Sequence, residues 1–294
     1  MSRATLGPYP LVRRLGSGGM AEVWLATAHG ASGFARAVAV KTLRPELIGD
    51  VALERALIHE ARLAGRLHHR NLVAVLGLGL DDGTYYVVLE YVDGGDLATL
   101  TRDRRLPLPL VLLVIEEVAL ALAYVHAARD DRGLPLGLVH RDVSPSNLLV
   151  SRAGEVKLAD FGIAKATALA DRTGGLRKGK HAYMSPEQLV GEPLTAASDQ
   201  FALGVTLIEL ATGARPFDGD TPLATMDNVR AGRLPPLPGL PSTIAAIAHR
   251  ALAARPADRF ADIEALRLAI AAERRALPPV APPDLAAWLA SPPR

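Results

Sequence analysis

A polar stretch in the middle of the chain carries a carboxylate and a carboxamide five residues apart. Residues 140–147 read His-Arg-Asp-Val-Ser-Pro-Ser-Asn, so Asp142 and Asn147 share one loop that follows an apolar segment. Carboxylates and carboxamides are among the side chains that handle protons and hard cations in enzymes. Asp and Asn near a Pro are also common turn residues, because their side chains bond to their own backbone. The stretch needs support from the rest of the chain before it can be given a role.

A glycine-rich hairpin is predicted near the N-terminus. Residues 11–28 form a short alternating run, a turn containing Gly16 and Gly18, and a second strand-like run. The pattern G-x-G-x-x-A also occurs in dinucleotide-binding turns, but a turn of that kind must open a helix. Residues 22–25 read Glu-Val-Trp-Leu, which favours a continuing strand. The hairpin interpretation is therefore preferred.

The segments after this hairpin predict a sheet with one helix. Residues 37–41, Ala-Val-Ala-Val-Lys, indicate a buried strand that ends in Lys41, and residues 51–67 have helical spacing. Two further strands are predicted over residues 72–80 and 85–91. Lys is rare, with five Lys among 33 basic residues, so a retained Lys carries some information.

The remainder of the chain is helical in character. Residues 108–128 predict a long apolar helix that precedes the polar stretch. Directly after the stretch, residues 148–158 predict a short hairpin, which delivers Asp-Phe-Gly at 160–162. Met-Ser-Pro-Glu follows at 184–187.

These motifs, in this order and spacing, resemble the protein kinase family, specifically the bacterial Ser/Thr (eukaryotic-like, Hanks-type) catalytic domain. The resemblance covers residues 9–275 and implies an α+β, bilobal protein kinase fold. It implies an N-lobe over residues 9–91, with a small antiparallel sheet and one key helix, and a larger, mainly helical C-lobe over residues 92–276. The Pro-rich tail over residues 277–294 is expected to be a linker or a docking segment.

The resemblance implies transfer of the γ-phosphate of ATP to Ser/Thr hydroxyls of proteins. Asp142 would position the attacking hydroxyl and receive its proton. Asn147 and Asp160 would hold Mg²⁺, with Mn²⁺ as an alternative ion.

The same resemblance implies how the nucleotide is bound. Lys41 would contact the α- and β-phosphates, and Glu60 would orient Lys41, with Glu54 as the competing candidate. The residues expected to contact the nucleotide are Gly16, Ser17, Gly18, Gly19, Val23, Ala39, Lys41, Glu90, Val92, Asp96 and Leu149. Ala21 stands where the family has a third glycine, which is a mild departure.

Two further contacts are implied in the C-lobe. Asp199, near the start of an apolar helix, would brace the backbone of the catalytic loop, and Arg259 would pair with Glu187. The residues around Glu187 are those that position a peptide, which disfavours a kinase fold that modifies small molecules.

The residue before the catalytic Asp implies regulation. Kinases with an Arg at the position of Arg141 are often switched by a phosphate in the activation segment, here residues 163–187. The expected acceptors are Thr173 and, less so, Thr167, and a dimer would allow autophosphorylation in trans. The alternative is that Arg141 merely bonds to loop carbonyls.

One departure affects the centre of the site. The family normally has a Lys two residues after the catalytic Asp, where it contacts the γ-phosphate, but this chain has Ser144. The chain also has Gly179-Lys180 where the family usually has Gly-Thr. The hypothesis is that the two changes are coupled, so that Lys180 supplies the charge that position 144 lacks. The alternative is that Lys180 is a solvated loop charge.

Composition limits the other classes. The 294 residues are about half apolar, which suffices for one large domain or two lobes, and they include no Cys. A formal net charge of +2 gives little support to nucleic acid binding. Glu116 and Glu117 interrupt the most apolar segment, so we expect no membrane-spanning segment. We expect a cytoplasmic location. A nucleotide-binding pseudokinase scaffold remains the alternative function.

Overall fold

The computed structural model describes residues 5–161, 180–237 and 239–291 of the chain. These residues fall into two compact units, here called the N-lobe and the C-lobe. The N-lobe holds residues 5–68, 73–91 and 161, and the C-lobe holds residues 69–72, 92–160 and the described residues from 180 onward.

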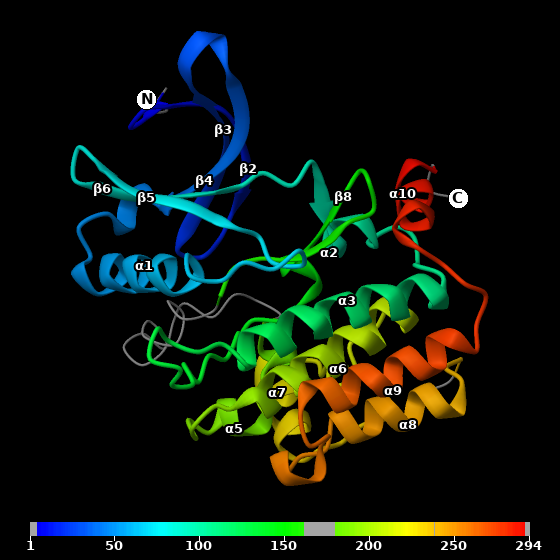
Figure 1. Ribbon diagram of the computed structural model, residues 1–294. Helices are drawn as coiled ribbons and strands as arrows, with labels where there is room; N and C mark the ends of the chain where they lie inside the picture. Colours follow the sequence, from blue (N-terminus) through cyan, green and yellow to red (C-terminus); the bar gives the residue numbers. More distant parts are fainter. Residues whose placement is uncertain (1–4, 162–179, 238, 292–294) are drawn as a thin grey trace. The chain divides into compact units, whose positions relative to one another are not determined.

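The N-lobe contains one six-stranded antiparallel sheet with the order β1-β2-β3-β4-β6-β5 (Figure 1). Its strands are β1 (Thr5–Leu6), β2 (Tyr9–Ser17), β3 (Ala21–His29), β4 (Ala35–Leu43), β5 (Val75–Asp81) and β6 (Thr84–Glu90). Short 3₁₀ turns span Ala31–Gly33 and Pro45–Leu47.

Alternation along β4 separates two faces of this sheet. Val38 and Val40 belong to a core with Leu6 and Val88. Because side chains alternate along a strand, Lys41 and Leu43 point to the other face. On that second face Leu43 packs with apolar residues of helix α1 (Val51–Ala64). Figure 1 shows α1 lying along β5 and β6, which it contacts.

Helix α1 begins at a strong capping residue. The Asp50 carboxylate accepts hydrogen bonds from the backbone N–H groups of Ala52 and Leu53, at 3.1 and 3.2 Å. Its apolar stripe of Leu53, Leu57 and Ala61 is buried against the sheet. The helix ends at Ala64, three residues earlier than its sequence pattern predicts.

Strand β5 starts at Val75 and not at residue 72, so the prediction of a strand over 72–80 was wrong at its start. Leu72 instead forms an isolated parallel bridge with Leu158 in the C-lobe, where it is buried. Leu72 is apolar because it is buried in the C-lobe. A sequence pattern cannot distinguish such a residue from an apolar residue of the strand that follows.

The C-lobe contains a three-stranded sheet and most of the helices. The strands, in the order β7-β8-β9, are β7 (Gly94–Asp96), β8 (Leu148–Ser151) and β9 (Val156–Leu158). The helices are α2 (Leu97–Leu100), α3 (Leu108–His126), α5 (Pro186–Leu189), α6 (Ala196–Thr212), α7 (Pro222–Arg230), α8 (Ser242–Ala251), α9 (Ile263–Arg275) and α10 (Pro282–Ala290). The 3₁₀ turns span Pro145–Asn147, Lys180–Tyr183 and Pro256–Asp258.

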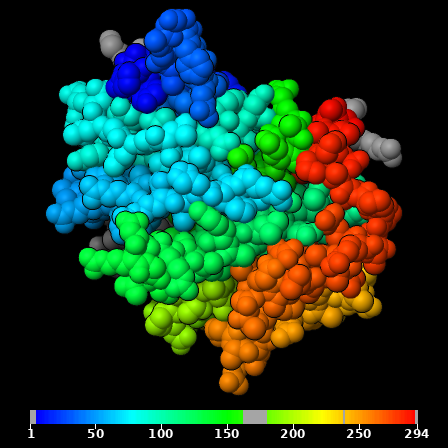
Figure 2. All heavy atoms as spheres, in the orientation of Figure 1, coloured from blue at the N-terminus to red at the C-terminus, as the bar shows by residue number. Residues whose placement is uncertain are grey.

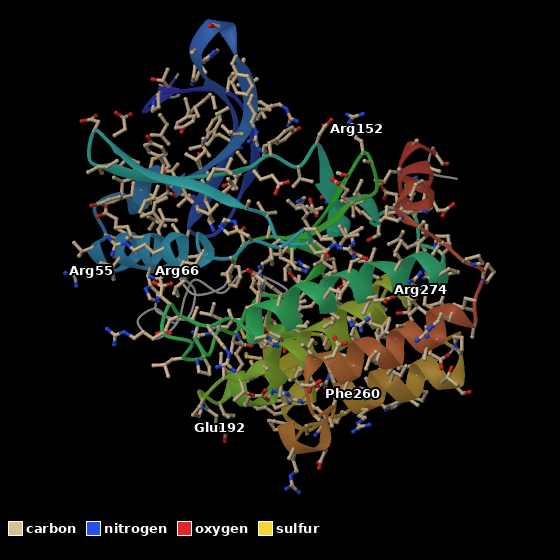
Figure 3. The ribbon with its side chains drawn as sticks, viewed as in Figure 1. Arg55, Arg66, Arg152, Glu192, Phe260 and Arg274 are labelled. Carbon is tan, nitrogen blue, oxygen red and sulfur yellow. The ribbon has the colours of Figure 1, made fainter. Side chains whose placement is uncertain are left out.

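Helix α3 is the central helix of the C-lobe and packs against α6, α9 and β9 (Figure 1). Its two acidic residues accept hydrogen bonds from neighbouring segments. Glu116 accepts a 2.6 Å hydrogen bond from Arg274, which Figure 3 labels on α9, and Glu117 accepts one of 2.7 Å from Asn71. By length and mean hydropathy of 2.2, α3 could cross a membrane, but 61% of that window is buried inside the structure.

The Pro-rich tail folds back onto the C-lobe. Helix α10 lies beside the β8–β9 turn, as Figures 1 and 2 show, and Leu285 is fully buried. A Cβ atom on Gly154, in the turn, would overlap the Pro282 carbonyl oxygen. The Arg104 guanidinium lies 3.7 Å from the centre of the Trp288 ring and donates to the Trp288 carbonyl at 2.8 Å. The described part of the tail is therefore a docked helix.

Candidate active site

The N-lobe contains an ion pair between its sheet and its helix. Lys41 Nζ lies 2.7 Å from Glu60 Oε1, and both side chains are largely buried. Lys41 pairs in register with Val23 on β3, so the two predicted nucleotide residues are neighbours across two strands. Glu54 accepts a 2.9 Å hydrogen bond from the Gly49 N–H, near the start of α1. The structure thus places Glu60, and not Glu54, at Lys41.

The glycine-rich hairpin is a tight β2–β3 connection. Gly16 pairs with Val23 and Ser17 pairs with Glu22, after a register shift in β2. The Gly18 N–H donates to the Ala21 carbonyl at 2.6 Å, which closes the turn that also contains Gly19. No heavy atom lies within 4 Å of the position that a Cβ on Gly16 would take. The space over this backbone suits a close approach by a phosphate group.

Asp142 is held by two other polar side chains of the C-lobe. Asn147 Nδ2 donates to the Asp142 backbone oxygen at 2.7 Å and to its Oδ2 at 2.6 Å. Lys180 Nζ lies 2.7 Å from Oδ1 and 2.6 Å from Oδ2 of the same carboxylate. The side chain of Asp142 is 9% exposed and that of Lys180 is 14% exposed. The Asp142 carboxylate is thus held in position by Asn147 and is paired with the positive charge of Lys180.

Position 144 carries no charge and is enclosed. Ser144 is 2% exposed, and its Oγ lies 3.0 Å from Ser146 Oγ. Its carbonyl oxygen accepts a 2.8 Å hydrogen bond from the Asn147 N–H, which closes the 3₁₀ turn begun by Pro145. This turn brings Asn147 back towards Asp142.

A buried carboxylate on α6 holds the backbone of the loop that contains Asp142. Asp199 Oδ2 accepts from the His140 N–H and Oδ1 accepts from the Arg141 N–H, both at 2.8 Å. His126 Nε2, from the end of α3, lies 2.8 Å from the same Oδ2. Arg141 has a φ of 69°, a left-handed conformation that side chains other than glycine rarely adopt. The bonds to Asp199 hold this strained backbone in place.

Asn147 and Asp160 are tied to each other through the β8–β9 hairpin. The Ala159 N–H donates to the Asn147 carbonyl at 2.9 Å, and Leu148 pairs with Leu158 in register. Asp160 follows directly and has a φ of 57°. Because Asn147 Nδ2 serves Asp142, its amide oxygen is the atom of this side chain that could bind a cation.

These two oxygen donors fit magnesium. Mg²⁺ is typically bound by one or two protein oxygens together with water and phosphate oxygens. The described residues contain no group of three or more His, Cys, Asp or Glu side chains that could hold a metal ion by themselves. A cation at Asn147 and Asp160 would thus take its remaining ligands from phosphate and water.

The predicted hinge residues lie between the end of β6 and the end of β7. The Glu90 N–H donates to the Ala74 carbonyl at 2.9 Å, so its backbone could bond to adenine only through the carbonyl. Asp96 caps α2 by accepting from the Thr99 N–H at 2.9 Å, and it pairs with Leu149 across β7 and β8. Val92 is half-buried, and Ala39 is buried on β4. Thr167 and Thr173 lie outside the described residues.

Two contact networks hold the end of the activation segment. Arg259 Nη1 and Nη2 donate to Glu187 at 2.8 and 2.9 Å, and Ser198 Oγ donates to it at 2.7 Å. Burial acts to raise the pKa of Glu187, but these hydrogen bonds outweigh it and hold the pKa below its ordinary value. Tyr183 donates to Glu209, and burial followed by the Glu209 charge raises the pKa of this tyrosine.

His126 is a residue of this site that the sequence interpretation missed. It follows an apolar helix, and no motif marks it. The available signal was an aromatic polar residue at the last turn of a helix that is otherwise buried.

Comparison with known proteins places these features in a family. Residues 9–267 match the protein kinase domain. The chain is 42% identical over 269 residues to the tyrosine-protein kinase MasK of Myxococcus xanthus, covering 88% of this chain and 42% of that protein. It is 36% identical over 284 residues to the serine/threonine-protein kinase PknA of Mycobacterium tuberculosis, covering 94% and 63%.

The similarity extends to solved structures. The crystal structure of the PknI kinase domain of Mycobacterium tuberculosis matches with a TM-score of 0.70 and 32% identity, over 94% of this chain and 99% of that one. The chain spans less than two thirds of the length of the curated relatives it matches. With a family match over most of its length and the N-terminal antiparallel sheet, its helix and the mainly helical C-lobe in place, the chain belongs to the protein kinase domain family.

Proposed function

We propose that this chain is an active, ATP-dependent protein kinase that phosphorylates Ser/Thr hydroxyls of proteins and autophosphorylates its activation segment. The observation that carries the proposal is the state of Asp142, a largely buried carboxylate bonded by Asn147 and Lys180. Its loop is also braced by Asp199. A pseudokinase has no need of such an arrangement, because a scaffold does not have to fix a proton acceptor.

Each lobe contributes one part of the chemistry. Bound ATP and its Mg²⁺ ions supply the transferable phosphoryl group and offset its charge. In the N-lobe, Lys41, oriented by Glu60, provides a fixed positive charge for phosphate oxygens. In the C-lobe, Asn147 and Asp160 present the oxygen atoms that hold the cations.

Asp142 orients the attacking hydroxyl and accepts its proton. Its carboxylate cannot rotate freely, because Asn147 bonds to both its backbone and its side chain. This fixed position reduces the entropy that the reaction must otherwise overcome.

A transfer assay with radiolabelled γ-phosphate tests the activity. Wild-type protein should label itself and a generic protein, and Asp142→Asn should lower the rate by about 100-fold or more. Asp142→Asn keeps the shape of the side chain, and nucleotide binding by this variant shows that its fold is intact. Nucleotide binding by the wild-type protein without any transfer would favour the pseudokinase scaffold.

The acceptor residue is tested in the same reaction. We propose Ser/Thr because relatives such as PknA are named serine/threonine-protein kinases. Transfer to Tyr is the second candidate, because MasK, with 42% identity, is named a tyrosine-protein kinase. Phosphoamino acid analysis of the labelled protein separates the two, and phosphotyrosine as the main product would reject the Ser/Thr proposal.

Thr173, with Thr167 as a second acceptor, is proposed as the site of an activating phosphate that Arg141 would bind. In the described part of the chain, Arg141 Nε is buried and has no hydrogen-bond partner. Mass spectrometry should find Thr173 phosphorylated in active enzyme. Active enzyme with both threonines unmodified would contradict this proposal.

A further inference from the structure

The chain lacks a cation on the catalytic loop at the position where its family resemblance leads one to expect Lys. Ser144 is almost fully buried, and its hydroxyl is within hydrogen-bond distance of Ser146. A hydroxyl cannot replace an ammonium group opposite a developing negative charge. If the chain is an active kinase, as proposed above, this charge must come from elsewhere.

Lys180 provides an ammonium group at the catalytic carboxylate. Its Nζ is 2.7 and 2.6 Å from the two oxygens of Asp142, which is 38 residues earlier in the chain. The side chain is 14% exposed, so the alternative of a solvated loop charge does not describe it. A largely buried ammonium needs a charged partner to offset its desolvation, and Asp142 is that partner.

The local structure holds Lys180 in this position. It begins the 3₁₀ turn Lys180–Tyr183, whose next two residues, His181 and Ala182, are buried. The last residue of the turn, Tyr183, donates a hydrogen bond to Glu209 on α6. The backbone that carries Lys180 is therefore anchored to the core of the C-lobe.

The chemistry of the side chain also matters. Lys has a compact ammonium with three donors, whereas Arg presents a planar fork. Asp142 accepts from Asn147 as well as from Lys180, so a compact cation leaves more of its surroundings open to a hydroxyl. In a chain with only five Lys among 33 basic residues, this choice agrees with a need for the smaller group.

We propose that Lys180 is the positioning residue that replaces the catalytic-loop Lys of the family: it holds the Asp142 carboxylate and supplies positive charge to the site from the activation segment. The inference rests on the proposed kinase function. It adds that the charge pattern of the site is complete only when residues of the activation segment fold onto the catalytic loop.

Steady-state kinetics of the full chain test this role. Lys180→Ala should lower kcat by about 100-fold or more, while KM for ATP changes less than about 3-fold. Lys157→Ala is the matched control, since Lys157 donates to the Arg70 carbonyl at an exposed site, and it should leave both constants unchanged. A kcat for Lys180→Ala within about 3-fold of wild type would overturn the proposal.

Relocation of the charge distinguishes a specific role from a merely structural one. The double variant Ser144→Lys/Lys180→Ala restores the family arrangement and should regain at least about 10-fold of the lost kcat. If that variant does not fold, added methylamine should raise the kcat of Lys180→Ala, because it can occupy the space of the missing ammonium. The proposal is wrong if neither treatment recovers activity.

A measurement without catalysis separates this inference from the proposed function. Thermal unfolding of Lys180→Ala, of Asp142→Asn and of Lys180→Ala/Asp142→Asn should give Tm shifts that are not additive, because the two side chains contact each other. Additive Tm shifts would show that Lys180 and Asp142 do not interact, and would overturn the proposal even if the enzyme is active. Absence of transfer in wild-type protein, together with non-additive shifts, would instead reject the kinase activity and keep the contact.

Discussion

Arg259 and Glu187 form a bidentate ion pair inside the C-lobe, with N–O distances of 2.8 and 2.9 Å. Arg259 also donates to the backbone carbonyls of Ala197 and Ala253, at 2.8 and 2.9 Å. The pair joins the end of the activation segment to the start of α6 and to the segment before α9. It therefore ties residue 187, at the end of the predicted activation segment, to two segments that follow it in the C-lobe.

Removing the positive partner of this pair should destabilise the protein strongly. Arg259→Ala leaves a buried carboxylate without its partner, which costs about 3–5 kcal/mol of unfolding free energy. Arg255→Ala is the control, because Arg255 is exposed and lies 3.9 Å from Asp258, and its cost should be below about 1 kcal/mol. Urea denaturation measures both, and similar midpoints for the two variants would contradict the assignment.

The same pair predicts a pH dependence of stability. The pKa of Glu187 is held below its ordinary value of 4.5 in the folded protein, so its ionised form stabilises the fold above that pH. This stability is lost as the pH falls below 4.5, towards the folded pKa. The gap in unfolding free energy between wild type and Glu187→Gln should be full at pH 7 and shrink below 4.5. A gap that stays constant with pH would show that the negative charge of Glu187 does not stabilise the fold.

Docking of α10 should depend on Gly154. An Ala at this position would overlap the Pro282 carbonyl and would be strained at a φ of +83°. If α10 is displaced, Leu285 loses its burial, and the total cost should be about 3 kcal/mol.

Gly191→Ala is the matched control for this substitution, because Gly191 has a φ of +74° with no atom within 4 Å. It should cost only the backbone strain, roughly 1–2 kcal/mol. In a Trp24→Phe background Trp288 is the sole tryptophan, and its fluorescence should become easier to quench in Gly154→Ala only. Equal quenching in both variants would argue against the docked helix.

Two glutamates on α1 should differ sharply in their effect on activity. Glu60→Gln weakens the 2.7 Å ion pair with Lys41 and should lower kcat/KM by about 100-fold. Glu54→Gln alters only a bond to the Gly49 N–H and should stay within a few-fold of wild type. Steady-state assays at several ATP concentrations check this, and comparable losses would indicate that α1 itself is disrupted.

Local patterns were sufficient to predict strands β2 to β6 and helix α1 of the N-lobe, but not the two-residue strand β1. Residues 37–41 predict a buried strand with Lys41 at its end, although β4 continues to Leu43, and the helical spacing of residues 51–67 includes Glu60, which is buried. Strand limits were less predictable: Leu72 belongs to the C-lobe, through its bridge to Leu158, and a contact over 86 residues leaves no local pattern.

The contacts that the sequence did not reveal are long-range and polar. His126 and Asp199 are 73 residues apart, and a single His at a helix end has no spacing motif. The Pro-rich composition of the tail suggested a linker as readily as a docked segment. Arg104, far earlier in the chain, holds the tail in its docked position. It donates to carbonyls at the end of α10 and stacks on Trp288.

The bond between Lys180 and Asp142 has a consequence for exchanging parts between relatives. Activation segments are attractive modules for chimeric kinases, since they carry the regulatory and peptide-binding residues. In this chain the segment also carries an ammonium group that the catalytic loop contacts. A chimera that receives a Gly-Thr segment would lose that group unless residue 144 becomes Lys in the same step. Residues 144 and 180 should therefore be transplanted together.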